Sequence, residues 1–486
     1  MVNTMQNIIL NIDELEKINL NESMIYEILK IPNFINKIRY IDSSGKPWGE
    51  WDKVCDFLEK KASEFGLLDL NNPTLKKEIE NPINYLYVFS NFFSLTQNIE
   101  ITFQLFCKLN NSQATIVLSR GGIADSLITF LRKNAKELTK LKPSLFILLL
   151  LKLNSIRSIN SEEECIIIQH YIEQYPQINT VNSILLKALK QRLSSLKGNM
   201  QLQIYTAKGK QRKIAIFITG QSRFSDKNLS NLRNTLSTIK SDYDLFVSTW
   251  SDVGGKHAES SKLSRHIPAS LVQDLVASKV NLHDVAVSIN EYYKKHEIIK
   301  ITLSTFENLN DYSNAFINIK DDNEFPYNEM SNPEKMYYHN CFWIRTIKQE
   351  NFWQSYTHIL KIRPDIECDF SALSELDISE NQILTEEANG WIFREWGFGI
   401  GDQIIYGKPE TSLKLLDGYN HQLAKEMCEV LFSKPQYHGH MNLGIIAWLE
   451  GITILRNDIF KHKLAATKKI STEQIMAMLS KPIGNI

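Results

Sequence analysis

The chain has 486 residues, in which 55 Lys and Arg residues balance 55 Asp and Glu residues, so that its formal net charge is zero. General binding to nucleic acid depends on a basic excess that neutralises phosphates, and we therefore expect no nucleic-acid partner. The hydrophobic share of 43% and the aromatic share of 10% are typical of globular proteins. A chain of this length is expected to form two or three domains.

Cysteine usage and the N-terminal stretch both bear on the compartment. The six cysteines are scattered without a C-x-x-C pair, which disfavours a zinc site or a disulfide framework and favours a reducing environment. The N-terminal MVNTMQNIILNIDELEKINL carries acids where an export signal has a basic region and an apolar run. The longest apolar run, Leu145 to Leu151, is far shorter than the ~20 residues of a membrane span. We expect a cytoplasmic protein, with peripheral association at the inner membrane face as an alternative.

Residues 1–205 carry Ile, Leu and Phe at steps of three and four residues, which predicts an α-helical domain. Asn160 to Glu164 is one of the expected helix boundaries. The candidate helices include Trp51 to Phe65, Asn84 to Phe106, Ile123 to Leu138, Glu163 to Tyr175 and Ser183 to Leu196. The basic stretch Lys187 to Lys213 marks the connection to the next domain. Such a helical domain is suited to binding an acceptor, a partner enzyme or a second copy of the chain as a homo-oligomer.

The pattern changes at Ile214 to Thr219, where IAIFIT is a continuous apolar run of the kind found in a doubly covered parallel strand. The turn Gly220 to Arg223 follows, then a helix, and then a second strand at Asp244 to Trp250. This order is the beginning of a βαβ unit. Its first turn offers glycine for close backbone approach and Arg223 for an anionic ligand.

Two further elements are expected before the central stretch. Ile298 to Ser304 reads as a strand, and a long helix runs from Glu334 to about Phe352 after a start at Ser331. Aromatic residues at helical spacing mostly belong to the core. Asn340 and Arg345 of this helix can instead face a ligand beside Asp365.

The central stretch is YTHILKIRPDIECDF, Tyr356 to Phe370. A short β-favouring core ends at Pro364, which breaks the pairing ladder, so the strand is expected to deliver Arg363 and Asp365 to a sheet edge. Ligands of open α/β sheets bind beyond the carboxyl ends of strands, which makes this pair a candidate site. The alternative is a surface turn with an ion pair of little consequence.

The remaining motifs follow closely. WIFREWGFGIGDQIIY, Trp391 to Tyr406, is a glycine-rich loop that presents Asp402 either as a general base or as a cap of the next segment. His438 and His440 precede an apolar helix, and Ile452 to Leu455 is a last strand. Residues 461–486 are expected to form a peripheral helical tail.

The order of strand-GQSR, DLFVSTW, a MYY…N helix, ILKIRPDI, FGIGDQIIYG, an apolar helix and ITIL resembles bacterial glycosyltransferase-like proteins of capsule and lipopolysaccharide clusters. The resemblance covers roughly residues 212–460. It implies the GT-A fold of nucleotide-sugar transferases, an α/β fold with a Rossmann-like mixed sheet, preceded here by the α-helical domain.

The resemblance also implies a donor site. Its residues would be Gly220, Gln221, Arg223, Trp250, Asp252, Asn340, Arg345, Arg363 and Asp365. In that fold an Asp-x-Asp sequence usually holds a divalent metal, whereas this chain has Arg363-Pro364-Asp365 and lacks one carboxylate. We favour Mg²⁺ or Mn²⁺ at Asp365, with Glu367 as a second oxygen ligand. The alternative is a metal-free site in which Arg363 neutralises the leaving diphosphate.

The implied reaction moves a sugar from a nucleotide-sugar donor to a hydroxyl of a glycan or glycolipid acceptor in cell-surface polysaccharide synthesis. If the transfer inverts the configuration of the sugar, Asp402 would be the base that accepts the acceptor proton; if it retains the configuration, Asp402 would only position the acceptor. His440 or His438 is an alternative base. A second hypothesis is a catalytically inactive, glycosyltransferase-like scaffold with a helical interaction domain. A third is another nucleotide-dependent enzyme, such as a nucleotidyltransferase.

Overall fold

The computed structural model describes residues 21, 57, 60, 61, 64–66, 99–118, 121–155, 158–175, 180–201, 213–221, 226–251, 258–296, 301–307, 309, 312–349, 352–376, 378–386, 400–432, 437, 439–457, 460, 462–464 and 469–479. The chain divides into two compact units. The first comprises Met1–Leu193, Trp391–Phe398 and Val430–Ser433, and the second comprises the rest.

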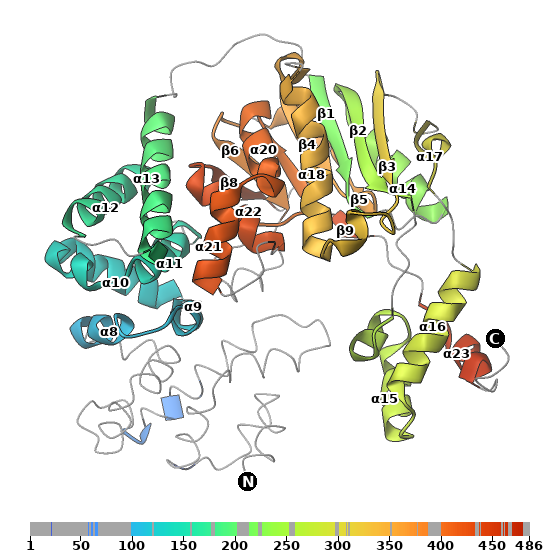
Figure 1. Cartoon of the computed structure of the whole chain (residues 1–486), viewed down its shortest axis with the longest axis horizontal. Helices are drawn as coiled ribbons and strands as arrows, with labels where there is room; N and C mark the ends of the chain where they lie inside the picture. The colour runs from blue at the N-terminus through green and yellow to red at the C-terminus, as the bar shows by residue number, and fades with distance from the viewer. Residues whose placement is uncertain are drawn as a thin grey trace. The chain divides into compact units, whose positions relative to one another are not determined.

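Every described element between residues 99 and 201 is a helix (Figure 1). They are α8 (Ile99–Phe106), α9 (Asn111–Leu118), α10 (Gly121–Lys133), η2 (Ala135–Lys140), α11 (Pro143–Ser155), α12 (Ser161–Gln174) and α13 (Thr180–Gln201). The predicted start near Asn160 is confirmed, because its side chain caps α12 by accepting from the backbone N–H of Glu163 at 2.9 Å. Most residues before 99 lie outside the described ranges, so an all-α domain over 1–205 stays a prediction.

The apolar run of α11 is buried from Leu145 to Leu151, as a core helix requires. Among the described residues, no helix is both long and apolar enough to cross a membrane. The same unit buries an ion pair: Arg192 donates to both carboxylate oxygens of Glu164, at 3.0 and 2.5 Å. Each charge compensates the other inside the core, where an unpaired charge is costly.

The second unit contains a mixed seven-stranded sheet of order β3-β2-β1-β4-β7-β6-β8. Its strands are β1 (Lys213–Thr219), β2 (Asp242–Trp250), β3 (Ala315–Lys320), β4 (His358–Ile362), β6 (Gln382–Glu386), β7 (Ile404–Gly407) and β8 (Thr453–Asn457). The first four strands are mutually parallel, β7 is antiparallel to both neighbours, and β6 is parallel to β8. The predicted α/β class with a mixed sheet is therefore confirmed.

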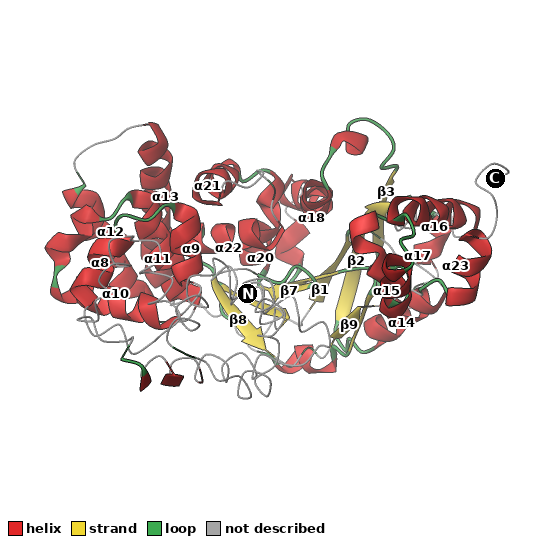
Figure 2. Ribbon diagram, turned by 90° about the horizontal axis from the view of Figure 1, so that it is seen from below, coloured by secondary structure: helices red, strands yellow, loops and turns green. Residues whose placement is uncertain are grey.

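Alternate residues of the central strands serve two cores. Ile216 and Leu360 point toward Leu232 of α14 (Asp226–Ser237), while Phe246 of β2 contacts Trp343 of α18 (Asn332–Gln349) on the other face. Figure 2 shows α18, α20 (Pro409–Leu416) and α22 (Gly439–Leu449) on one side of the sheet and α14 on the other. Sequence period and fold agree here, since strands covered on both faces read as continuous apolar runs.

The remaining elements are helices, 3-10 helices and a separate two-stranded sheet, and part of them forms a hydrophobic cluster of its own. They are η3 (Ser260–Arg265), α15 (Ala269–Ala277), α16 (Leu282–His296), α17 (Leu303–Glu307), η4 (Tyr327–Glu329), η5 (Phe352–Ser355), β5 (Ile366–Cys368), η6 (Ser371–Glu375), η7 (Asp417–Tyr419), α21 (Gln422–Phe432), β9 (His462–Leu464) and α23 (Thr472–Leu479). The stretch predicted as a peripheral tail contributes β9, which pairs with β5, and α23, whose Ile475 is buried against α15 and α16.

The strand predicted at Ile298 to Ser304 is wrong in its described part. Ile301 and Thr302 belong to no strand, and Leu303 begins α17; residues 297–300 lie outside the described ranges. The third parallel strand is instead β3, AFINIK. It lies at the sheet edge with mostly half-buried side chains, so it lacks the strong apolar run that identifies the central strands.

Candidate functional site

The strand order reverses between β1 and β4, which are parallel neighbours although distant in sequence. Ligands of open α/β sheets bind in the crevice at such a point, beyond the carboxyl ends of the strands. Gly220 directly follows the end of β1, and its φ of +109° lies in the region that favours glycine. Gln221 follows and is exposed, whereas Arg223 lies outside the described residues.

At the end of β4, Arg363 and Asp365 form a two-pronged ion pair across Pro364. The guanidinium Nε donates to Oδ1 at 2.9 Å, and Nη2 donates to Oδ2 at 2.8 Å. The side chain of Asp365 is fully buried, while that of Arg363 is 23% exposed. Burial by itself lowers the pKa of Arg363, but the Asp365 carboxylate outweighs it and raises the pKa above its usual value.

These residues do not fit a divalent metal at Asp365 as arranged. Both carboxylate oxygens already accept from Arg363, so an ion would have to displace the guanidinium. Glu367, proposed as a second ligand, is exposed and accepts from Asn231 of α14 at 3.1 Å. No group of three or more His, Cys, Asp or Glu residues suited to a metal occurs among the described residues, which do not include Asp252.

A buried lysine outside the predicted set of site residues lies beside this pair. Lys361 of β4 is 1% exposed, and its Nζ donates to the main-chain carbonyl of Asp402. Burial lowers the pKa of Lys361. Burial alone raises the pKa of Asp402, but Lys361, His440 and Arg363 together outweigh it and lower the pKa. Asp402 therefore remains a carboxylate near neutral pH.

A second unpredicted residue, Glu386 at the end of β6, holds the segment that carries Asp402. Its carboxylate accepts from the backbone N–H of Gln403 at 3.1 Å and of Ile404 at 2.8 Å. Burial raises the pKa of Glu386. The carboxylate fills the space beside Gly401, where any Cβ would overlap with it. Glu386 thus pairs the N–H groups at the start of β7, the kind of role that the sequence offered for Asp402.

The structure brings the two predicted catalytic residues together. His440 lies in the first turn of α22, and its Nδ1 is 2.8 Å from the carbonyl oxygen of Ile400 and 3.9 Å from Oδ1 of Asp402. The His440 side chain is 34% exposed and that of Asp402 is 15% exposed. The imidazole is therefore partly accessible at the carboxyl edge of the sheet. His438 lies outside the described residues.

Asn340 lies at the same edge. Its Oδ1 accepts from the hydroxyl of Thr219 at 2.6 Å, and its buried Nδ2 has no hydrogen-bond partner among the described residues. Ile218 and Ile362 form the last pair of the β1–β4 register, so Thr219 and Arg363 come next to each other. Asn340 therefore belongs to the same side of the switch point as Arg363.

Trp250 closes this edge at the end of β2. It is 2% exposed and stacks on Tyr338, while the edge of His339 contacts it at 4.2 Å between ring centroids. Lys335 lies over its ring at 5.4 Å. Trp250 is thus a buried part of an aromatic cluster and forms the wall of the edge rather than an open stacking surface.

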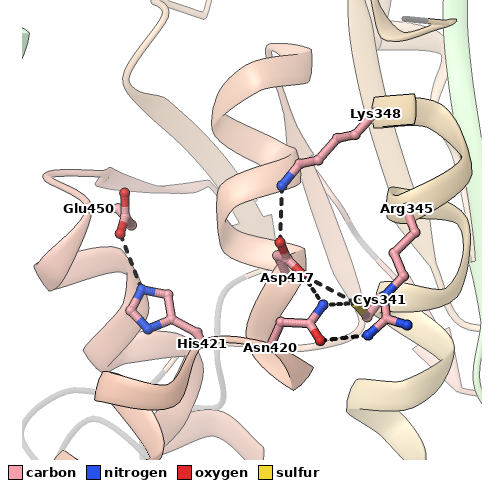
Figure 3. Close-up of polar contacts among 7 residues, drawn as sticks. All are labelled: Cys341, Arg345, Lys348, Asp417, Asn420, His421 and Glu450. Carbon is pink, nitrogen blue, oxygen red and sulfur yellow. Dashed lines mark hydrogen bonds and ion pairs between the residues drawn. The ribbon is translucent and has the colours of Figure 1, made fainter. Parts of the chain in front are cut away.

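Arg345 belongs to a different polar cluster, which ties α18 to η7 (Figure 3). Its Nη2 donates to Asn420 Oδ1 at 2.8 Å, and Asn420 in turn donates to Asp417, which also pairs with Lys348. Cys341 completes the cluster through Asp417. Arg345 lies five residues beyond Asn340, about 7.5 Å further along the helix and away from the carboxyl edge. The structure does not bring Arg345 together with Arg363 and Asp365.

Lys361 and Glu386 left only faint sequence signals: a lysine inside the apolar run ILKI and an acid at the end of ILTE. Comparison with models of known protein families finds no match, and comparison with curated proteins finds none either. Function is therefore inferred from this site.

Proposed function

We propose that the second unit is a nucleotide-sugar-dependent glycosyltransferase with a GT-A-like fold, acting on a hydroxyl of a cell-surface glycan or glycolipid. One observation carries the proposal: the Arg363–Asp365 pair and the Asp402–His440 pair lie at the same sheet edge, where Lys361, two residues before Arg363, donates to the carbonyl of Asp402. A phosphate-binding cation and a proton acceptor at one switch point are what this transfer requires.

Arg363 supports the donor half of the reaction. Asp365 occupies the Nε and Nη2 positions of its guanidinium and so fixes the orientation of the group. The side chain stays partly exposed, so the remaining N–H donors can face a diphosphate. Negative charge develops on that diphosphate as the sugar leaves, and a preorganised cation stabilises it. Of the two alternatives from the sequence, this arrangement favours the metal-free one.

Asp402 and His440 support the acceptor half. Both lie at the carboxyl edge, and both side chains are partly exposed. We place the reaction in the cytoplasm, close to the inner membrane face where lipid-linked acceptors are built. The helical unit would bind the acceptor, a partner or a second copy of the chain.

A thermal-shift screen with UDP-, GDP- and CMP-sugars, with and without Mn²⁺, tests the proposal on the wild type and on Asp365→Ala. A ligand that binds the folded state raises the melting temperature by mass action. We expect one nucleotide class to raise it in the wild type without Mn²⁺. A shift that requires both Mn²⁺ and Asp365 would restore the metal-dependent alternative.

Hydrolysis of the selected nucleotide sugar separates an enzyme from a scaffold. An inactive scaffold of this fold would give neither a shift nor release of nucleoside diphosphate. Arg345→Ala is the matched control, because this residue lies in the separate cluster of η7 and should leave the nucleotide shift unchanged.

A further inference from the structure

The contact between His440 and Ile400 determines which imidazole nitrogen is free. A carbonyl oxygen can only accept a hydrogen bond, so the Nδ1 that lies 2.8 Å from the Ile400 oxygen must carry the proton. In the neutral ring, Nε2 then has the lone pair. The backbone N–H of Ile400 also donates to the carbonyl of His440 at 3.3 Å, so two hydrogen bonds join these residues.

The segment that supplies this carbonyl is held from two strands. Lys361 of β4 binds the carbonyl of Asp402, and Glu386 of β6 binds the N–H groups of Gln403 and Ile404. Both side chains are at most 2% exposed. Burial of a lysine and a glutamate costs free energy unless their polar groups find partners. Here both side chains form hydrogen bonds with the backbone of the same five residues, 400–404.

We propose that Lys361 and Glu386 are positioning residues that hold segment 400–404 so that Ile400 fixes the Nδ1–H tautomer of His440, and that His440 Nε2 is the proton acceptor of the site. The second half rests on the proposed function. In the transfer, the acceptor O–H bond breaks and its proton goes to Nε2. The acceptor oxygen bonds to the sugar carbon, and the bond from that carbon to the diphosphate breaks, its electron pair leaving with the phosphate.

Asp402 supports this step through charge. Its carboxylate lies 3.9 Å from His440 Nδ1 and is faced by Lys361 and Arg363 from β4. When Nε2 accepts a proton the ring becomes an imidazolium, which the carboxylate stabilises. Asp402 therefore assists His440 and is not itself the base.

Nitrogen NMR of ring-labelled histidine tests the positioning half without any substrate. The chain has 11 histidines, so His440→Gln identifies the signal and His283→Gln, at an exposed position of α16, serves as the control. We expect a protonated Nδ1 and an unprotonated Nε2 for His440 in the wild type. In Lys361→Met and in Glu386→Gln the single tautomer should give way to a mixture. An Nε2–H tautomer in the wild type overturns the proposal, and so does an unchanged tautomer in both folded variants.

Kinetics test the proton-acceptor half. In His440→Asn the amide can still donate to Ile400, but nothing occupies the position of Nε2. We expect its melting temperature to stay near that of the wild type, its KM for the nucleotide sugar to be unchanged, and kcat for hydrolysis to fall about 10²–10⁴-fold. Lys361→Met and Glu386→Gln should lower kcat about 10²-fold, because segment 400–404 then no longer holds the His440 imidazole in its orientation.

The two failures are distinguishable. If no nucleotide sugar is bound or hydrolysed, the proposed function fails while the tautomer measurement still stands or falls by itself. If hydrolysis occurs and His440→Asn retains full kcat, the proposed function stands and His440 is not the proton acceptor.

Discussion

The guanidinium of Arg363 forms two hydrogen bonds with the carboxylate of Asp365, at 2.9 and 2.8 Å, within the turn that ends β4. Pro364 between them prevents the strand from continuing, so the pair is folded back against the sheet edge. The carboxylate is buried and the guanidinium partly exposed. One residue thus anchors the other, and the anchored cation is the one that a ligand can reach.

Arg363→Met is expected to destabilise the protein more than Asp365→Leu does, because the first variant leaves the buried carboxylate in place and the second removes it. Arg363→Met removes the guanidinium that compensates the buried Asp365 carboxylate, and the loss of one partner of a buried ion pair costs about 3–5 kcal/mol. The double variant Arg363→Met, Asp365→Leu should recover much of this loss, since neither charge then remains. The melting temperatures of the wild type, the two single variants and the double variant form a double-mutant cycle. Additive losses would contradict the pairing.

Chelation is expected to leave donor binding intact. If Arg363 and not a metal ion binds the diphosphate, EDTA should not change the dissociation constant of the nucleotide sugar that is identified in the thermal-shift screen. Arg363→Lys should weaken binding about 10–100-fold, because a lysine offers one point charge without the fork of donors. Isothermal titration of both proteins with and without EDTA decides between the two outcomes. A loss of affinity in EDTA alone would contradict this expectation and restore the metal-dependent alternative.

Gly401 is expected to tolerate no side chain. A Cβ there would overlap with the carboxylate of Glu386, which cannot retreat because Gln403 and Ile404 hold it. Gly401→Ala should therefore lower stability by about 1–3 kcal/mol, and Glu386→Ala in the same chain should relieve the overlap. Gly439→Ala is the matched control, because nothing lies within 4 Å of its Cβ. Equal melting temperatures for Gly401→Ala and Gly439→Ala would show that the Glu386 carboxylate does not exclude a side chain at position 401.

The local sequence predicted the central strands of the sheet correctly but not the edge strand β3. β1, β2 and β4 are buried on both faces, so their apolar runs were readable without knowledge of the fold. β3 is half-buried, whereas the apolar stretch before it that favours a strand leads into a helix instead. Pairing with β2, which lies far away in sequence, decides this strand, and a local pattern carries no such information.

Some residues of the candidate site could likewise be predicted from the sequence and others could not. Arg363 and Asp365 could be predicted from the sequence because a proline directly after an apolar strand indicates where the strand ends. Lys361 and Glu386 were not, because their roles depend on β4, β7 and β6 lying side by side, with β7 antiparallel. A lysine inside an apolar strand is the one local signal that could have drawn attention to the first of them.

Asp244, at the amino edge of β1 and β2, gives a pH-dependent contribution to stability. Its side chain is 3% exposed and accepts from Tyr356 at 2.6 Å, Lys213 at 2.8 Å and Asn314 at 3.0 Å. Burial by itself raises the pKa of Asp244, but these three partners outweigh it and lower the pKa below its usual value. The charged form is therefore the one that the fold favours.

A folded-state pKa below the unfolded value of about 3.9 means that this stabilisation is complete above that value and is lost as pH falls through the folded-state pKa. Asp244→Asn should lower stability by about 2 kcal/mol at pH 7, because hydrogen bonds to a charged group are replaced by weaker ones. The gap in melting temperature between wild type and variant should narrow as the pH is lowered from 7 to about 3. Asp274→Asn, at an exposed position of α15, should show no gap at either pH. A gap for Asp244→Asn that stays constant on acidification would show that the carboxylate charge does not contribute.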